Sequence, residues 1–280
     1  MATRREIYNA LYSAACELYD ANEAKQIAQM LTLAKGNITR NDLLIEPNKE
    51  LVISNLEDII AELRSWRPVQ YIIGAADFRD MELEVREGVL IPRPETEELV
   101  EWIASEATAG ATILDIGTGT GAIAIALNRE VKESRVWAMD ISAEALGIAR
   151  SNGERFSPSV TFVEGDALAD FSSLFTSKFD VVVSNPPYIP EADTQLMRRN
   201  VLDYEPATAL FVPDNDPLLF YRSIAHTSKK VLKAEGKLYF EIYELLATEM
   251  IEMLEKEGYH DITLRNDFRG KPRMICATLR

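Results

Sequence analysis

The chain has 280 residues, of which 47% are hydrophobic and 27% charged, and it carries a formal net charge of −15. This composition is typical of globular proteins and provides enough apolar surface for one large core or two smaller ones. It argues against a membrane protein, because no stretch approaches the roughly 20 apolar residues of a transmembrane helix. The first residues also lack the apolar segment of a signal peptide. We therefore expect a soluble, cytoplasmic protein without a membrane partner.

The acidic charge argues against a protein that binds naked nucleic acid. Such proteins owe most of their affinity to Lys and Arg side chains that neutralise phosphates. The longest basic runs here are the pairs Arg198-Arg199 and Lys229-Lys230. The chain has two histidines and two cysteines, far apart in the sequence, which is too few for a typical zinc site. We expect no direct DNA binding and no metal.

Residues 1–66 predict a small, all-helical domain. Apolar residues recur at helical spacing from Ile7 to Leu18 and again over residues 22–34, before Gly36. Ser54-Asn55-Leu56-Glu57 has the pattern of a capping box at the start of a third helix. Helices this short need to pack on one another to be stable. Because this domain lies outside the remaining fold, we expect it to recognise the substrate.

Residues 67–90 predict a β-hairpin connector. Apolar and acidic residues alternate from Met81 to Val85, and Pro68, Gly74 and Gly88 separate the strand-like pieces. The prolines of Leu90-Ile91-Pro92-Arg93-Pro94 then predict an extended approach to a helix over residues 97–107. The third region, residues 91–280, begins here.

From Ala111 onward, predicted strands and helices alternate, which is typical of a doubly wound α/β domain with a mostly parallel sheet. Val181-Val182-Val183 is the β-branched run expected of a strand buried on both faces. The seven predicted strands cover residues 112–116, 135–140, 160–164, 179–184, 237–242, 260–264 and 274–279. The main predicted helices between them cover residues 121–128, 143–151, 218–232 and 244–256.

A glycine-rich loop follows the first of these strands, with the sequence Asp115-Ile116-Gly117-Thr118-Gly119-Thr120-Gly121. Glycines let a backbone turn tightly and approach a ligand closely. The spacing differs from the G-x-G-x-x-G dinucleotide fingerprint, and no Gly-Lys-Ser/Thr follows, which disfavours a phosphate-binding loop. The acidic residue at its start suits a ligand with an amino group and a sulfonium cation better than a pyrophosphate.

Two more carboxylates are expected at the same sheet edge. Asp140 ends the second strand, where it can accept hydrogen bonds from ribose hydroxyls, and Asp166 follows the third, where it can accept an adenine amino group. The alternative is local: Asp140 would cap the next helix, and Asp166 would form a turn.

Asn185-Pro186-Pro187-Tyr188, here called the acceptor motif, follows the fourth strand directly. Its prolines stiffen the loop and leave carbonyls as acceptors. The Asn185 side-chain oxygen and the Pro186 carbonyl can together hold both hydrogens of an NH₂ group, and Tyr188 offers a flat apolar face. A simple proline-rich turn is the alternative, but the glycine-rich loop on the same sheet edge favours a site for a planar nitrogen acceptor.

These segments resemble one family over nearly the whole chain. The glycine-rich loop and the acceptor motif are similar to those of class I, Rossmann-like methyltransferases that modify amino and amide nitrogens. Residues 67–74 (Arg-Pro-Val-Gln-Tyr-Ile-Ile-Gly) and 89–97 (Val-Leu-Ile-Pro-Arg-Pro-Glu-Thr-Glu) narrow the resemblance to the peptide chain release factor glutamine methyltransferases, or protein-(glutamine-N5) methyltransferases. Residues 205–206, 209–210 and 270–273 are weaker matches. One departure is Asp216-Pro217, where the family resemblance leads us to expect an Asp-Gly turn.

The resemblance implies S-adenosylmethionine as methyl donor, S-adenosylhomocysteine as product, and a class I release factor as partner. The acceptor would be the glutamine of its Gly-Gly-Gln motif, methylated on the side-chain nitrogen. The residues it assigns to the cofactor are Gly117, Thr118, Gly119, Thr120, Gly121, Asp140, Asp166, Ala167 and Asn185. It assigns the glutamine to Asn185, Pro186, Pro187 and Tyr188, with Asn185, Pro186 and Tyr188 as catalytic residues.

Three other functions compete with this prediction. A DNA or RNA amino-methyltransferase of the adenine N6 type also fits the acceptor motif, but the acidic charge disfavours it. An NAD-dependent oxidoreductase lacks its fingerprint here and leaves the acceptor motif unexplained. A non-catalytic binding module would leave both motifs without a role.

Overall fold

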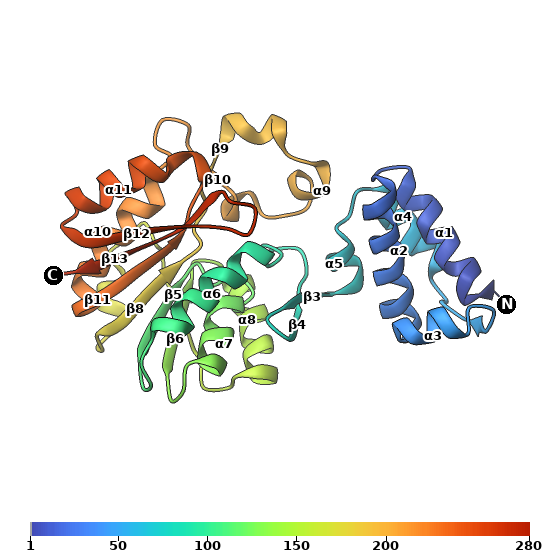
Figure 1. Ribbon diagram of the computed structural model, residues 1–280, viewed down its shortest axis with the longest axis horizontal. Coiled ribbons are helices and arrows are strands. Elements are labelled where there is room, and N and C mark those ends of the chain that lie inside the picture. Colours follow the sequence, from blue (N-terminus) through green and yellow to red (C-terminus); the bar gives the residue numbers. More distant parts are fainter. Residues whose placement is uncertain (1) are drawn as a thin grey trace. The chain divides into compact units, whose positions relative to one another are not determined.

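The computed structural model describes residues 2–280, which divide into two compact units (Figure 1). The helical unit comprises the residues up to Ala75 together with Met197–Tyr204, and the sheet unit comprises Ala76–Leu196 and Glu205–Arg280. This division differs from the predicted boundaries after residues 66 and 90, because residues 67–75 join the helices and 76–90 join the sheet. None of the helices in the described part of the chain is both long and apolar enough to cross a membrane.

The helical unit has the predicted helical character and its own core. Its elements are β1 (Ala2–Thr3), α1 (Arg4–Cys16), α2 (Ala21–Gly36), α3 (Arg40–Ile45), β2 (Glu50–Leu51), α4 (Leu56–Arg64), α5 (Val69–Ile73) and α9 (Arg199–Leu202). The fully buried residues Leu11, Leu31 and Leu63 come from three different helices, as the predicted apolar spacing requires.

Two local predictions in this region were wrong. The capping box at Ser54 does not form, because α4 begins at Leu56 and its N-cap is Asn55, whose side chain makes no capping bond. Capping boxes stand instead at Thr3 and Thr39, before α1 and α3. The second error is α5, which occupies part of the predicted hairpin connector. Its Ile72 is buried in the helical core, so tertiary packing outweighs the β-propensity of this short segment.

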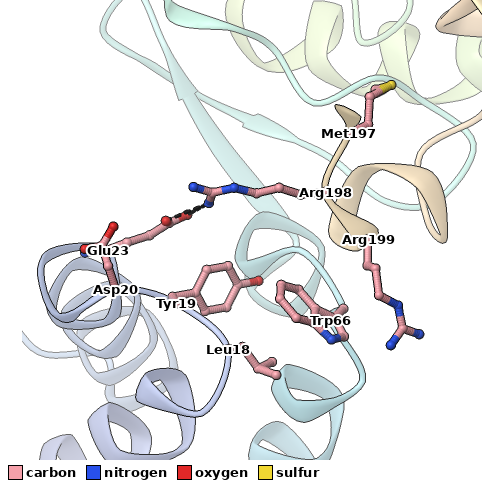
Figure 2. A pocket seen from close by; sticks show the side chains of 8 residues that line it. All are labelled: Leu18, Tyr19, Asp20, Glu23, Trp66, Met197, Arg198 and Arg199. Atoms are coloured by element: carbon pink, nitrogen blue, oxygen red, sulfur yellow. Dashed lines mark hydrogen bonds and ion pairs between the residues drawn. The ribbon is translucent and has the colours of Figure 1, made fainter. Parts of the chain in front are cut away.

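A segment from far along the sequence completes the helical unit. Arg198 forms an ion pair with Glu23 of α2 at 2.7 Å, and the Tyr204 hydroxyl donates to the Ser65 carbonyl at 2.9 Å. Figure 2 shows Arg198 reaching Glu23 while Arg199 points away from it, and the Tyr19 and Trp66 rings lie next to each other. The chain therefore leaves the sheet unit after Leu196 and re-enters it at Glu205.

The sheet unit contains a seven-stranded sheet in the order β12-β13-β11-β8-β5-β6-β7. Its strands are β5 (Thr112–Ile116), β6 (Arg135–Asp140), β7 (Thr161–Glu164), β8 (Phe179–Ser184), β11 (Leu232–Glu241), β12 (Tyr259–Asn266) and β13 (Pro272–Leu279). Neighbours pair in parallel except at β13, which is antiparallel to both β11 and β12. The predicted mostly parallel, seven-stranded α/β sheet is confirmed.

Helices cover both faces of this sheet (Figure 1). Val181 and Val183 face the core beneath one layer, and Val182 faces the opposite core, as the two-residue period of a strand requires. The first layer contains α6 (Pro94–Glu106), α7 (Ala122–Glu130) and α8 (Ala143–Phe156), and the second contains α10 (Leu219–Val231) and α11 (Ala247–Lys256). Both faces of the central strand are therefore buried.

Shorter elements complete the sheet unit. The predicted hairpin forms from β3 (Ala75–Phe78) and β4 (Met81–Glu84), and β9 (Ile189–Pro190) pairs with β10 (Phe211–Val212). The 3₁₀ turns are η1 (Phe171–Leu174), η2 (Glu191–Leu196), η3 (Ala207–Ala209) and η4 (Glu244–Leu246). At the departure from the family pattern, the Asp216 amide donates to the Pro213 carbonyl and its carboxylate pairs with Arg222 at 2.9 Å. A turn therefore forms there without glycine.

Candidate active site

The glycine-rich loop and the acceptor motif meet where the strand order reverses. β5 lies between β6 and β8, so the chain proceeds outward from β5 to β7 and then returns to β8 on the other side. Ile116 and Ser184 are register partners at the ends of β5 and β8, and the Ser184 hydroxyl donates to the Ile116 carbonyl at 2.7 Å. Such a reversal is the usual ligand crevice of an open α/β sheet.

A cavity of about 440 Å³ occupies this edge of the sheet. The predicted site residues that line it are Gly117, Gly119, Asp140, Asp166, Ala167, Asn185, Pro186 and Pro187. The other predicted site residues, Thr118, Thr120, Gly121 and Tyr188, are not among its lining residues. The structure thus brings both motifs and both carboxylates to one cavity.

The glycines of the loop leave the backbone open to a ligand. Gly117 and Gly119 have φ values of +74° and +54°, and a Cβ built on either would meet no atom within 4 Å. Gly121 is different, because a Cβ there would lie 2.9 Å from the Ile125 side chain. The first two glycines therefore expose backbone at the cavity, whereas the third permits close packing under α7.

Asp115 is fully buried beneath the loop and does not line the cavity. Its Oδ2 accepts a hydrogen bond of 2.7 Å from the Thr118 hydroxyl. Burial, with a smaller contribution from the charge of Asp140, raises the pKa of Asp115 to about 7. Direct contact with a cationic ligand, the role suggested by its position in the sequence, does not follow from this geometry; Asp115 instead organises the loop.

Asp140 and Asp166 both line the cavity, and each also makes the local hydrogen bonds of the alternative interpretation. The Asp140 carboxylate accepts from the Gly119 and Ser142 amides, both at 2.9 Å. Asp166 Oδ1 accepts from the Leu168 amide at 2.8 Å. A carboxylate has about four acceptor positions, so both roles are compatible. Asp140 thereby ties the glycine-rich loop to the end of β6.

Asn185 is held by a buried hydrogen-bonded chain. Its Nδ2 donates to Thr96 Oγ1 at 3.3 Å, and the Thr96 hydroxyl donates to Glu241 Oε2 at 2.6 Å. The Tyr188 hydroxyl donates to the other oxygen, Oε1, at 3.2 Å. The Tyr188 ring stacks on Tyr243 with the ring planes 12° apart. Both ends of the acceptor motif are therefore fixed to the end of β11.

Glu241 is 1% exposed, and burial raises its pKa. Hydrogen bonds from Thr96 and Tyr188 and the positive charge of Arg273 oppose this effect by stabilising the carboxylate. Burial likewise raises the pKa of the Tyr188 hydroxyl, and the negative charge of Glu241 adds to the increase. Tyr188 therefore remains a neutral donor at physiological pH.

A second buried carboxylate, Glu205, lies next to a residue that lines the cavity. Glu205 accepts from the Ile91 amide at 3.1 Å and pairs with Arg93 at 2.7 Å. The Glu205 side chain is 1% exposed and that of Arg93 is 33% exposed, so removal of Arg93 would leave a buried carboxylate without its ion-pair partner and destabilise the fold. The proline-containing approach to α6 is thus tied to the residue preceding Pro206, which lines the cavity.

Comparison with known proteins agrees with this geometry. Residues 94–203 match the methyltransferase small domain family. A release factor glutamine methyltransferase of Bacteroides thetaiotaomicron is 42% identical over 266 residues, which cover 93% of this chain and 95% of that protein. The chain belongs to the release factor glutamine methyltransferase family. A second member, from Flavobacterium psychrophilum, is 39% identical over 95% of this chain and 96% of its own length.

The fold comparison agrees at a coarser level. A methyltransferase from Pyrococcus furiosus superposes with a TM-score of 0.54 and 20% sequence identity, covering 80% of this chain and 98% of that one. This likeness shows that the chain has the class I methyltransferase fold. The family resemblance drawn from the sequence is confirmed by the two relatives above.

Two residues around the acceptor motif were not found by sequence reasoning. Thr96 belongs to a segment recognised for its family pattern but was given no role, and Glu241 was not considered. The one available signal was a carboxylate at the end of the otherwise apolar run Leu238-Tyr239-Phe240-Glu241-Ile242. A charged residue in such a run needs a buried partner, which suggests a site.

We expect Gly119→Ala to weaken binding of the methyl donor by about tenfold or more, because a side chain at this positive φ strains the loop and enters the cavity. Gly110→Ala is the matched control, since Gly110 has φ +79° and equally open surroundings but does not line the cavity. Calorimetric titration with S-adenosylhomocysteine checks this. Equal affinity of the two variants would contradict the role of Gly119.

We compare the free energy of unfolding of the ligand-free wild type with that of Asp115→Asn. We expect the wild-type value to decrease relative to the variant value as the pH rises from 4 to 8. The folded state holds a proton on Asp115 up to about pH 7, so this stabilisation is complete below the ordinary pKa of 3.8 and lost as the pH rises through 7. The loss is at most about 4 kcal/mol, at about 1.4 kcal/mol per pKa unit.

Urea unfolding at several pH values measures this difference. Asp170→Asn is the control, because a hydrogen bond from Lys230 lowers the pKa of Asp170 to about 2, so any pH dependence that Asp170 contributes has the opposite sign and is nearly complete by about pH 5. A pH dependence that is identical in wild type and Asp115→Asn would refute the assignment.

Proposed function

We propose that this methyltransferase transfers the methyl group of S-adenosylmethionine to the side-chain nitrogen of the glutamine in the Gly-Gly-Gln motif of class I release factors. The observation that carries the proposal is the convergence of Asn185 and the glycine-rich loop on one cavity at the strand-order reversal. The names of the relatives, release factor glutamine methyltransferases, support the choice of acceptor. The reaction would take place in the cytoplasm, where translation terminates.

The cavity residues fit the proposed donor. Gly117 and Gly119 leave room for a ligand against the backbone, and Asp140 and Asp166 supply acceptors for hydroxyl and amino groups. Ile141 and Leu168 also line the cavity and are 62% and 43% exposed, so they offer apolar surface to a planar base. The donor supplies a methyl group bound to a sulfonium sulfur. In the transfer this carbon–sulfur bond breaks, a carbon–nitrogen bond forms, and the amide loses one proton.

Positioning has to provide most of the rate acceleration. An amide nitrogen shares its lone pair with the carbonyl, and complete twisting of that bond costs on the order of 18–20 kcal/mol. Hydrogen bonds from the NH₂ group to Asn185 and the Pro186 carbonyl contribute only about 0.5–1.5 kcal/mol each. Holding both reactants in attack geometry contributes roughly 7–11 kcal/mol. The acceptor motif is therefore mainly a device for orientation.

We also propose that the release factor docks on the helical unit at the pocket of Figure 2, lined by Leu18, Tyr19, Asp20, Glu23, Trp66, Met197, Arg198 and Arg199. Trp66 has φ +73°, a conformation that is costly for a bulky residue and is found preferentially at functional sites. Aromatic and Arg side chains are the commonest energetic anchors of protein interfaces. One wall of this pocket, residues 197–199, belongs to the chain stretch that follows the acceptor motif.

We expect Asn185→Ala to lower kcat by about 100-fold while the affinity for S-adenosylhomocysteine changes little, because the carboxamide orients the acceptor. The measurement follows labelled methyl groups from S-adenosylmethionine into release factor, DNA and RNA. A release factor with Gly-Gly-Gln changed to Gly-Gly-Glu is the control acceptor. Label in DNA or RNA and none in the release factor would favour the alternative, an adenine N6-type methyltransferase.

We expect Trp66→Ala to raise KM for the release factor by about tenfold without changing kcat or cofactor affinity, because the indole would contact the protein substrate. Tyr8→Ala is the control, since Tyr8 lies in a different pocket of the same helical unit. Thermal unfolding of both variants reports any loss of folding. An unchanged KM in a folded Trp66→Ala protein would contradict docking at this pocket.

A further inference from the structure

The carboxamide of Asn185 must have a defined orientation. Its Oδ1 and Nδ2 are similar in size, but Oδ1 accepts hydrogen bonds and Nδ2 donates them. If the group turned by half a rotation, it would present a donor to the NH₂ group of the acceptor, and the hydrogen bond would be lost. The surroundings of Asn185 therefore decide whether the acceptor motif can hold an amide.

The hydrogen bonds that link Asn185, Thr96 and Glu241 can run in only one donor-to-acceptor direction. Glu241 Oε1 accepts from the Tyr188 hydroxyl and Oε2 accepts from the Thr96 hydroxyl, and an ionised carboxylate has no proton to donate. Because the Thr96 hydroxyl gives its single proton to Glu241, its oxygen can only accept from Asn185. The group facing Thr96 must then be Nδ2, which is the observed arrangement, at 3.3 Å.

We propose that Thr96 and Glu241 are positioning residues that hold Asn185 with Oδ1 turned toward the acceptor amide. This inference rests on the proposed function, in which an NH₂ group is the acceptor. Thr96 is 5% exposed in the first turn of α6, and Glu241 is 1% exposed at the end of β11. Neither is among the residues that line the cavity, so both act through Asn185 and Tyr188.

Three groups around Glu241 stabilise the ionised form that this mechanism requires, against a burial that raises its pKa overall. Arg273 of β13 stabilises the carboxylate, and the hydroxyls of Thr96 and Tyr188 each donate to it. Burial and the charge of Glu95 on α6 act in the opposite direction. If Glu241 were replaced by glutamine, its NH₂ group could donate to Thr96. The Thr96 hydroxyl would then be free to donate to Asn185 and stabilise the reversed carboxamide.

The alternative is that these hydrogen bonds only stabilise the packing of α6 against β11 and do not orient Asn185. The protein contains a matched control for this case, because Thr112 is also a buried threonine whose hydroxyl donates to a carboxylate, Asp180, at 2.7 Å. Thr112 lies at the start of β5, at the opposite end of the strand from the glycine-rich loop. Thr112→Val therefore removes an equivalent hydrogen bond without affecting Asn185.

The kinetic test compares four variants with release factor as acceptor. We expect Thr96→Val and Glu241→Gln to lower kcat/KM for the release factor by about tenfold, the upper range for one lost hydrogen bond, with unchanged affinity for S-adenosylhomocysteine. Thr96→Ser keeps the hydroxyl and should retain activity within about twofold, and Thr112→Val should leave kcat/KM unchanged. If Thr96→Val resembles Thr112→Val, or Thr96→Ser loses as much as Thr96→Val, the proposal is wrong.

A measurement without acceptor separates this proposal from the proposed function. With ¹⁵N-labelled asparagine, the side-chain resonances of Asn185 are those missing in Asn185→Ala. A through-space contact between its Nδ2 protons and the Thr96 methyl group is expected in the folded protein, and its absence would overturn the orientation. If the wild-type chain methylates no release factor while this contact is present, the proposed function fails and the orientation stands.

Discussion

The parallel pairing of β5 and β8 is the constraint on which the rest of the site depends. Their register places Ile116 beside Ser184, so the two loops that follow these strands start at the same level of the sheet. Both strands are buried on both faces, and a shift of one residue would turn every side chain toward the opposite core, where it does not fit the packing. The glycine-rich loop and the acceptor motif are therefore held together by the hydrophobic core of the sheet rather than by direct contacts with each other.

The elements that could be predicted from the sequence are those with a local physical signal. Alternating strands and helices imply a doubly wound sheet, and the rule that ligands bind beyond the carboxyl ends of strands then brings Gly119, Asp140 and Asn185 to one edge. The roles of individual side chains were less accessible. Asp115 belongs to the most recognisable motif, yet it is buried beneath the loop, because the sequence does not specify on which side of a turn a side chain will lie.

Apart from the helix caps, the features that escaped prediction depend on contacts between distant residues. Arg198 and Glu23 are 175 residues apart, and Thr96 and Glu241 are 145 apart. No local pattern around Arg198 indicates that it belongs to the helical unit. The error at α5 has the same origin, since Val69–Ile73 has β-propensity and becomes helical through packing against the helical core. Local patterns predict elements, but long-range packing decides which of them become neighbours.

A buried carboxylate behind the acceptor motif can fix which groups donate and which accept in the hydrogen bonds that reach Asn185. Uncharged hydrogen-bonded chains can reverse, because each hydroxyl or amide can exchange donor and acceptor roles. Glu241 breaks this symmetry when it is ionised, at a cost in desolvation that Arg273 and two hydroxyl donors reduce. An apolar residue in its place would stabilise the fold at least as well, but it would leave Thr96 free to donate in either direction. In the proposed role, Glu241 is an ionisable group kept in the interior of the sheet unit because it orients one amide, at a cost in stability.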